Sequence, residues 1–242
     1  MKVFVFCERC IKEILRDPIN LFFCFGFLIA LLLLLSAIQA NIPADLFNIE
    51  TLTPGISVFG LSFLTLFSAS LIAKDRESLF LERLYTTPLT SIEFILGYIL
   101  SMLPIAFIQS IACYLIAILL GLPITINILF AILLLLPIAI FNISFGLLCG
   151  SLFNVKQVGG ICGALFTNLS GWLSGIWFDL NLVGGVFLFV AKVLPFYHSV
   201  EAVKCCILGE YSNIPIHILI VSIYALCMCV GASIMFLRQM KK

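Results

Sequence analysis

Residues 55–93 read GISVFGLSFLTLFSASLIA followed by KDRESLFLERLYTTPLTSIE. The first nineteen residues contain no Asp, Glu, Lys or Arg, whereas the next twenty hold seven of the twenty-five charged side chains in the chain. A helix needs about 20 apolar residues to cross a hydrocarbon core of about 30 Å. The junction therefore predicts a membrane-crossing helix that delivers a charged loop, residues 74–93, into water.

The same uncharged pattern recurs along the 242 residues, and the six predicted spans are 19–40, 55–73, 94–120, 126–150, 159–178 and 214–237. Charged residues make up only 10% of the chain, whereas soluble domains carry about 25%. The sequence shows no internal repeat or linker. We therefore expect one all-α polytopic membrane domain, residues 1–242, with six transmembrane helices.

Two further segments are expected to be helical without crossing the membrane. Residues 2–17 place apolar side chains on one helical face and charged ones on the other, which is typical of a helix in the membrane interface. Residues 179–213 hold two apolar runs of about 12 residues, each too short to span, separated by Pro195. They are predicted to be short external helices, either re-entrant or surface-lying, ended by Gly209.

Lysine and arginine predict the orientation. With both termini in the cytoplasm, eleven of the thirteen basic residues lie inside, and only Lys192 and Lys204 lie outside. This predicts a multi-pass protein of the cell membrane, in contact with membrane lipid. The net charge of +1 gives no sign of a nucleic-acid partner.

The uncharged spans narrow the function classes. Ion-driven carriers usually place ionisable side chains within the membrane, and no Asp, Glu, Lys or Arg occurs in the six predicted spans. The chain also lacks a phosphate-binding loop motif, a hydrolase triad and a metal-ligand pattern. We therefore expect no catalytic residue, no metal and no bound cofactor, with energy supplied by a partner.

Mildly polar residues inside the spans are candidates for a translocation pathway or for hydrogen bonds between helices. The pathway candidates are Ser62, Thr65, Thr167, Asn168, Ser170 and Ser174. Pairs of glycines one turn apart let helix backbones approach closely. The candidates for helix packing or a dimer contact are Gly159, Gly163, Gly171 and Gly175, and Gly146-x-x-x-Gly150 gives a weaker signal.

The charged loop has a helical pattern of its own. Between residues 77 and 87, a wheel places Phe80, Leu81, Leu84 and Tyr85 on one side and polar side chains on the other. Leu79 falls on the polar side, and the charges nearly cancel, whereas a lipid anchor favours excess Lys and Arg. A short helix ended by Pro88 and docked to a soluble partner is therefore favoured over a solvated loop.

Three features resemble the permeases of the type-2 ATP-binding-cassette exporter family. The first is Arg76-Glu77, then Leu81-Glu82-Arg83-Leu84-Tyr85-Thr86-Thr87-Pro88-Leu89-Thr90, Glu93 and Leu96-Gly97. The second is Ser174-Gly175-Ile176-Trp177-Phe178 followed by residues 194–204. The third is the plan of helices over nearly the whole chain. Lys204 and Tyr98 depart from the residues common in the family.

The resemblance implies a half-transporter. Two permeases, identical or different, would pair, and separate cytoplasmic ATPase subunits would bind ATP and Mg²⁺. Residues 74–93 would form the coupling helix seated on the ATPase, with contacts from Asp75, Arg76, Glu77, Leu79, Glu82, Arg83, Thr86, Thr87 and Pro88.

We therefore expect an exporter subunit for an amphipathic or hydrophobic cargo such as a drug, peptide or lipid-like molecule. A haem- or polysaccharide-export permease of the same fold is the alternative within the family. A membrane scaffold or immunity protein without an ATPase is the alternative outside it.

Overall fold

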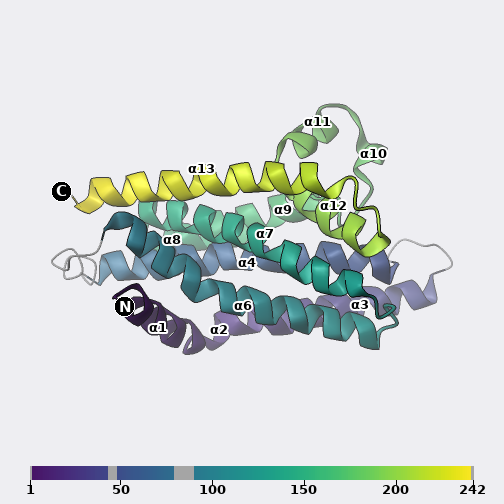
Figure 1. Cartoon of the computed structure of the whole chain (residues 1–242), viewed down its shortest axis with the longest axis horizontal. Coiled ribbons are helices and arrows are strands. Elements are labelled where there is room, and N and C mark those ends of the chain that lie inside the picture. Colours follow the sequence, from purple (N-terminus) through teal and green to yellow (C-terminus); the bar gives the residue numbers. More distant parts are fainter. Residues whose placement is uncertain (1, 43–47, 79–89, 241–242) are drawn as a thin grey trace.

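The computed structural model describes residues 2–42, 48–78 and 90–240, and these residues form helices and no strand. The long helices lie side by side along one axis (Figure 1). They are α3 (Phe27–Asn41), α4 (Ile49–Glu77), α6 (Ser91–Leu119), α7 (Ile126–Leu152) and α13 (Ile214–Met240). The all-α class predicted from the apolar segments is confirmed.

The N-terminal segment forms an elbow before the first long helix. Helix α1 (Lys2–Leu15) buries Phe6, Cys10 and Ile14, whereas Glu8 and Lys12 lie on its exposed side, as an amphipathic pattern predicts. Asp17 then caps α2 (Pro18–Leu21), which continues through the π-helix η1 (Phe22–Gly26) into α3.

The two ends of the bundle differ. The beginning of α1 and the end of α13 lie at the same end, which also holds the end of α4 and the beginning of α6 (Figure 1). We call this the terminal end and the opposite one the far end. Residues 79–89, which join α4 to α6, lie outside the described residues.

Helix α4 is the centre of the bundle, and most of its apolar stretch is buried. It packs closely on α7 because Gly146 and Gly150 lack side chains at the contact. A Cβ atom on Gly146 would lie 2.2 Å from the Thr65 carbonyl oxygen, and one on Gly150 would lie 2.4 Å from that of Ala69. Hydroxyl groups fix the contact, since Ser68 Oγ donates to the Ile143 carbonyl at 3.1 Å.

Five helical stretches of the described residues are long and apolar enough to cross a membrane. They are Pro18–Asn41, Ile49–Glu77, Ile92–Leu119, Ile126–Leu152 and Ile214–Arg238, and they correspond to five of the six predicted spans. A sixth counts by the same measure only if α11 and α12, bent by 75°, form one broken span.

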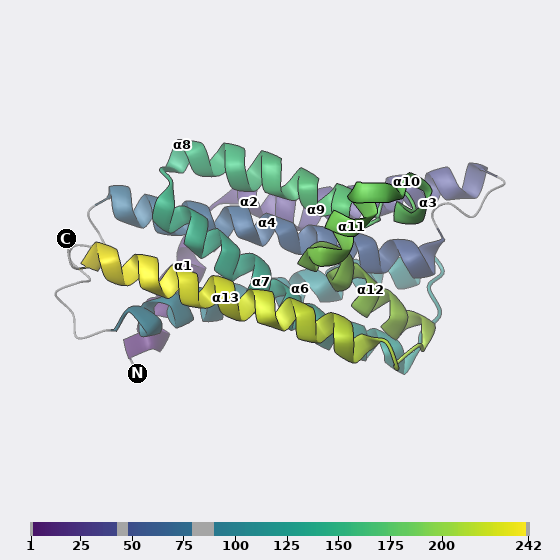
Figure 2. The same cartoon turned by 90° about the horizontal axis from the view of Figure 1, so that it is seen from above.

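The predicted span 159–178 has a different extent. Its helix consists of α8 (Val155–Val158), the π-helix η2 (Gly159–Phe166) and α9 (Thr167–Leu173), which follow one another along the bundle (Figure 2). The helix ends five residues before the predicted boundary. Gly175, at φ +78°, lies in the turn that follows and not one helical turn after Gly171, which corrects the sequence prediction.

The segment that follows forms three short helices near the far end (Figure 1). They are α10 (Leu180–Val183), α11 (Gly185–Val193) and α12 (Pro195–Leu208). The break falls at Leu194–Pro195, and Gly209 ends α12 with a left-handed φ of +80°, as the Pro and Gly signals predict.

Candidate functional site

Asp75 joins three helices at the terminal end. It lies in the last turn of α4 with only 1% of its surface exposed. Arg9 of α1 donates from Nη1 to Oδ2 at 2.7 Å and from Nη2 to Oδ1 at 2.5 Å, and the Tyr98 hydroxyl of α6 donates to Oδ2 at 2.7 Å. This two-pronged ion pair satisfies both carboxylate oxygens where the chain leaves α4.

The charge on Arg9 is secured by its surroundings. Burial lowers the pKa of the Arg9 guanidinium, but the hydrogen bond and charge of Asp75 more than offset it and raise the pKa above its ordinary value. Glu13 lies on the same side of α1 and contacts Arg9 at 2.6 Å. Arg9 therefore stays a cation that bridges two carboxylates.

Arg76 holds the end of α7. Its Nη1 donates to the carbonyl oxygens of Gly150 and Ser151, each at 2.7 Å. The last carbonyls of a helix have no partner within the helix, and its C-terminal end favours a cation. Arg76 therefore serves as the C-terminal cap of α7.

Glu77 and Lys74 complete the set of contacts. Glu77 Oε1 accepts from the backbone N–H of Val155, the first residue of α8, where a carboxylate is favoured. Lys74 Nζ lies 3.4 Å from Asp17, the N-cap of α2. Four consecutive residues, Lys74–Glu77, thus reach the α1–α2 elbow, α6, the end of α7 and the start of α8. We call them the α4 hub.

The hub changes the expectation for the coupling residues. Asp75 is buried and fully bonded, so it has no face open to a docking partner. Arg76, which is half-buried, and Glu77, which is exposed, bond to the chain itself and keep part of their surface open, so their predicted coupling role stays a prediction. Leu79, Glu82, Arg83, Thr86, Thr87 and Pro88 lie outside the described residues. The partners Arg9 and Tyr98 were not among the predicted site residues, although Tyr98 stood out as a departure from the family pattern.

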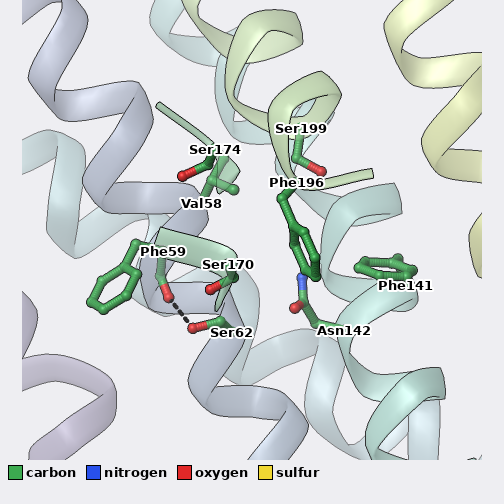
Figure 3. A pocket seen from close by; sticks show the side chains of 9 residues that line it. All are labelled: Val58, Phe59, Ser62, Phe141, Asn142, Ser170, Ser174, Phe196 and Ser199. Atoms are coloured by element: carbon green, nitrogen blue, oxygen red, sulfur yellow. Dashed lines mark hydrogen bonds between the residues drawn. The ribbon is translucent and has the colours of Figure 1, made fainter. Parts of the chain in front are cut away.

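A second feature is a small cavity inside the bundle (Figure 3). It has a volume of about 10 Å³, close to the smallest space that holds one water molecule. Its walls come from α4, α7, α9, the turn after α9, and α12. The lining residues are Val58, Phe59, Ser62, Phe141, Asn142, Ser170, Ser174, Phe196 and Ser199.

The cavity presents hydrogen-bond acceptors. Each of its four serines donates its proton to a carbonyl of its own chain segment, at distances of 2.6–3.0 Å. The hydroxyl lone pairs remain for another group. Asn142 is the amide in the wall, and one of its hydrogens goes to the Ile138 carbonyl at 2.9 Å. The lining contains no charged side chain.

Three predicted pathway residues, Ser62, Ser170 and Ser174, meet at this cavity, but the other three do not line it. Thr65 donates to the Asn142 carbonyl at 3.0 Å and so packs α4 on α7. Thr167 donates to a carbonyl of the π-helix η2, whereas Asn168 is exposed and donates to Ala164. Asn142 and Ser199 are lining residues outside the predicted set.

The predicted packing glycines occupy different environments. Gly171 is buried against Phe59 and Trp177. Gly163 meets only the flexible end of Leu66, and a Cβ atom on Gly159 meets no described atom within 4 Å. The close contact inside the protomer uses Gly146 and Gly150 instead.

The arrangement is a charged hub in the last turn of α4 and a helix bundle whose inner cavity has an uncharged, partly polar lining. The sequence profile of the ABC-2 type transporters matches residues 1–208. The chain belongs to this family. Comparison with curated proteins gives no match. Membership makes this ABC-2 protein a transport component and implies association with an ABC ATPase and with membrane lipid.

Proposed function

We propose that this ABC-2 protein is the membrane permease subunit of an ATP-driven exporter that moves an amphipathic or hydrophobic cargo out of the cytoplasm. The observation that carries the proposal is the α4 hub. A force on the loop after Glu77 meets four adjacent residues that are each bonded to a different part of the bundle. Such a junction suits the transmission of movement from a docked ATPase.

The distribution of basic residues supports a cytoplasmic terminal end. The basic residues whose side chains are described there are Arg9, Lys12, Arg16, Lys74, Arg76, Lys156 and Arg238, whereas Lys192 and Lys204 belong to the far-end helices. Basic residues accumulate on the cytoplasmic side of membrane proteins. Both chain ends and the loop after α4 then face the ATPase.

ATP and Mg²⁺ belong to separate ATPase subunits in this proposal, and a second permease completes the transporter. Leu79, Glu82, Arg83, Thr86, Thr87 and Pro88 supply the docking surface. Asp75, which is buried, holds that surface to the bundle together with Arg76 and Glu77.

Movement of the hub can reach the cavity through hydrogen bonds to two helices that line it. Glu77 holds the start of α8, and α8 continues through η2 into α9, which carries Ser170. Arg76 holds the end of α7, which carries Asn142. A π-helix is a frequent site of functional rearrangement within a helix, and η2 lies between the hub and the cavity wall.

The proposed cargo class rests on the predicted spans, which carry no Asp, Glu, Lys or Arg, and the lining of the small cavity between them agrees with it. Hydroxyl oxygens and three phenylalanine rings suit a neutral group that is part apolar and part hydrogen-bond donor. An anionic group finds no cation there.

The test is charge reversal in the docking loop. We expect Glu82→Lys with Arg83→Glu to weaken co-purification of the ATPase and to abolish ATP-dependent export, while membrane insertion is retained. The control reverses the far-end pair Glu201 and Lys204, which lie 3.3 Å apart, and should leave ATPase binding intact. Unchanged ATPase binding and export in the first variant would refute the assignment. Failure of any ATPase to bind the wild-type chain would favour a scaffold.

A further inference from the structure

Two histidine rings join the short helices to the last span near the far end. His198 Nδ1 of α12 lies 2.7 Å from His217 Nδ1 of α13. His198 Nε2 lies 2.8 Å from the carbonyl oxygen of Lys192 in the last turn of α11. The His198 ring is buried, and the two ring centres are 5.0 Å apart. The pair therefore links three helices through one side chain.

The contacts limit how many protons the pair can hold. A carbonyl oxygen only accepts, so His198 Nε2 carries a hydrogen. Two nitrogens at 2.7 Å need one hydrogen between them. In the neutral pair His217 Nδ1 donates to His198 Nδ1, and in the singly charged pair His198 Nδ1 donates to His217 Nδ1. With both rings charged, two N–H groups face each other and the bond is lost.

The acidic group beside the pair already has a partner. Glu201, one turn after His198 on α12, contacts Lys204 at 3.3 Å. Tyr197 packs its ring on both histidines. Other ionisable groups of the described far-end segments include Asp179, Lys192, Cys205, Cys206, Glu210, Tyr211 and Tyr224.

The neighbouring long helices add no charge at the pair. Helix α7 has no charged side chain, and Arg238 is the charged residue of α13 at its opposite end. Helix α4 carries its charges at its two ends, Glu50 and the hub.

We propose that His198 and His217 form a one-proton binding site that holds α12 against α13 and releases it when a second proton binds. The neutral and singly charged pairs keep the link, and the doubly charged pair opens it. This site is separate from the ATPase-coupling role and is present in the permease chain alone.

Acid is expected to destabilise the folded chain, because the unfolded chain binds more protons at the two histidines than the linked pair does. Histidine ordinarily titrates near pH 6.5. Below that pH the unfolded chain binds two protons at these rings, whereas the linked pair binds one. Acid therefore favours the unfolded chain, and one extra proton changes the unfolding equilibrium about tenfold per pH unit. The stabilisation is fully present above about pH 6.5 and is lost as the pH falls.

The experiment compares thermal unfolding of the purified full chain in lipid nanodiscs at pH 7.5 and pH 5.5. The informative variant is His217→Asn, whose amide can donate to His198 or accept from it but does not titrate. We expect the midpoint of the wild type to fall about 3 °C further on acidification than that of His217→Asn. The variant His217→Leu should unfold at a lower midpoint at pH 7.5, because His198 Nδ1 loses its partner.

The control is Tyr224→Phe, which removes a non-titrating bond from Tyr224 Oη to the Val193 carbonyl at 3.1 Å, between α13 and the end of α11. Its midpoint should shift equally at both pH values. Equal acid sensitivity of the wild type and His217→Asn would overturn the one-proton site. In that case the margin between their midpoints would be the same at pH 5.5 as at pH 7.5.

Discussion

Asp75 is the residue on which the terminal end depends most. Its carboxylate is buried, and the groups bonded to it come from α1 and α6, far from it in sequence. Removing one partner of a buried ion pair leaves the other charge without compensation, which costs more than the pair contributes when intact. The Arg9 side chain keeps 33% of its surface exposed, so solvent offsets part of this cost.

We expect Asp75→Asn to destabilise the chain by about 2 kcal/mol, which lowers the unfolding midpoint by about 5 °C. Glu8→Gln is the matched control, because Glu8 and Lys12 form an exposed ion pair at 2.6 Å on α1, the helix that carries Arg9. Thermal unfolding in detergent at neutral pH measures both variants. A midpoint for Asp75→Asn equal to that of Glu8→Gln would contradict the buried pair.

The hub also shows which features of single residues a local sequence pattern can predict and which it cannot. The charge cluster at residues 74–77 is visible in the sequence, but the direction of each side chain is not. A helical wheel cannot pair Asp75 with Arg9 or Glu77 with Val155, because these partners meet only when α1 and α8 pack on α4. The family pattern marked Tyr98 as unusual, and its hydroxyl proves to bind the buried carboxylate.

At the scale of elements, the contact between α4 and α7 brings two long helices of the bundle into close backbone contact. Gly146 and Gly150 bring the two backbones together, and Thr65 and Ser68 bond across the gap. In the sequence this glycine pair was the weaker signal, because glycine spacing identifies a face that can pack closely without identifying its partner. The length of the apolar runs predicted five of the six spans well. The helix of the remaining predicted span, residues 159–178, ends early, and Gly175 lies in the turn that follows it.

A pair of glycine variants tests the packing. Gly146→Val places carbons within the Thr65 carbonyl contact and should prevent recovery of folded protein, as judged by monodisperse size-exclusion elution. Gly159→Val is the control, since its side chain meets no described atom of the protomer, and it should elute as folded protein. A folded Gly146→Val protein with a wild-type midpoint would show that α4 and α7 do not approach as described.

At the scale of the whole molecule, composition and family resemblance predicted the class, and the match over residues 1–208 supports it. The bundle places the beginning of α1, the end of α13 and the end of α4 at one end, which is the arrangement that the proposed docking of an ATPase requires. The cargo and the second permease depend on surfaces between chains. A single sequence does not encode those contacts in any local pattern.

The most direct test of the account is photo-crosslinking from residue 79 in intact cells that produce the ATPase subunit. A benzophenone amino acid replaces Leu79, and the same amino acid replaces Tyr211 beyond α12 as the control. We predict a light-dependent adduct between residue 79 and the ATPase, and none from residue 211. Absence of the ATPase adduct from residue 79, with both proteins present in the membrane, would contradict the coupling role of this loop.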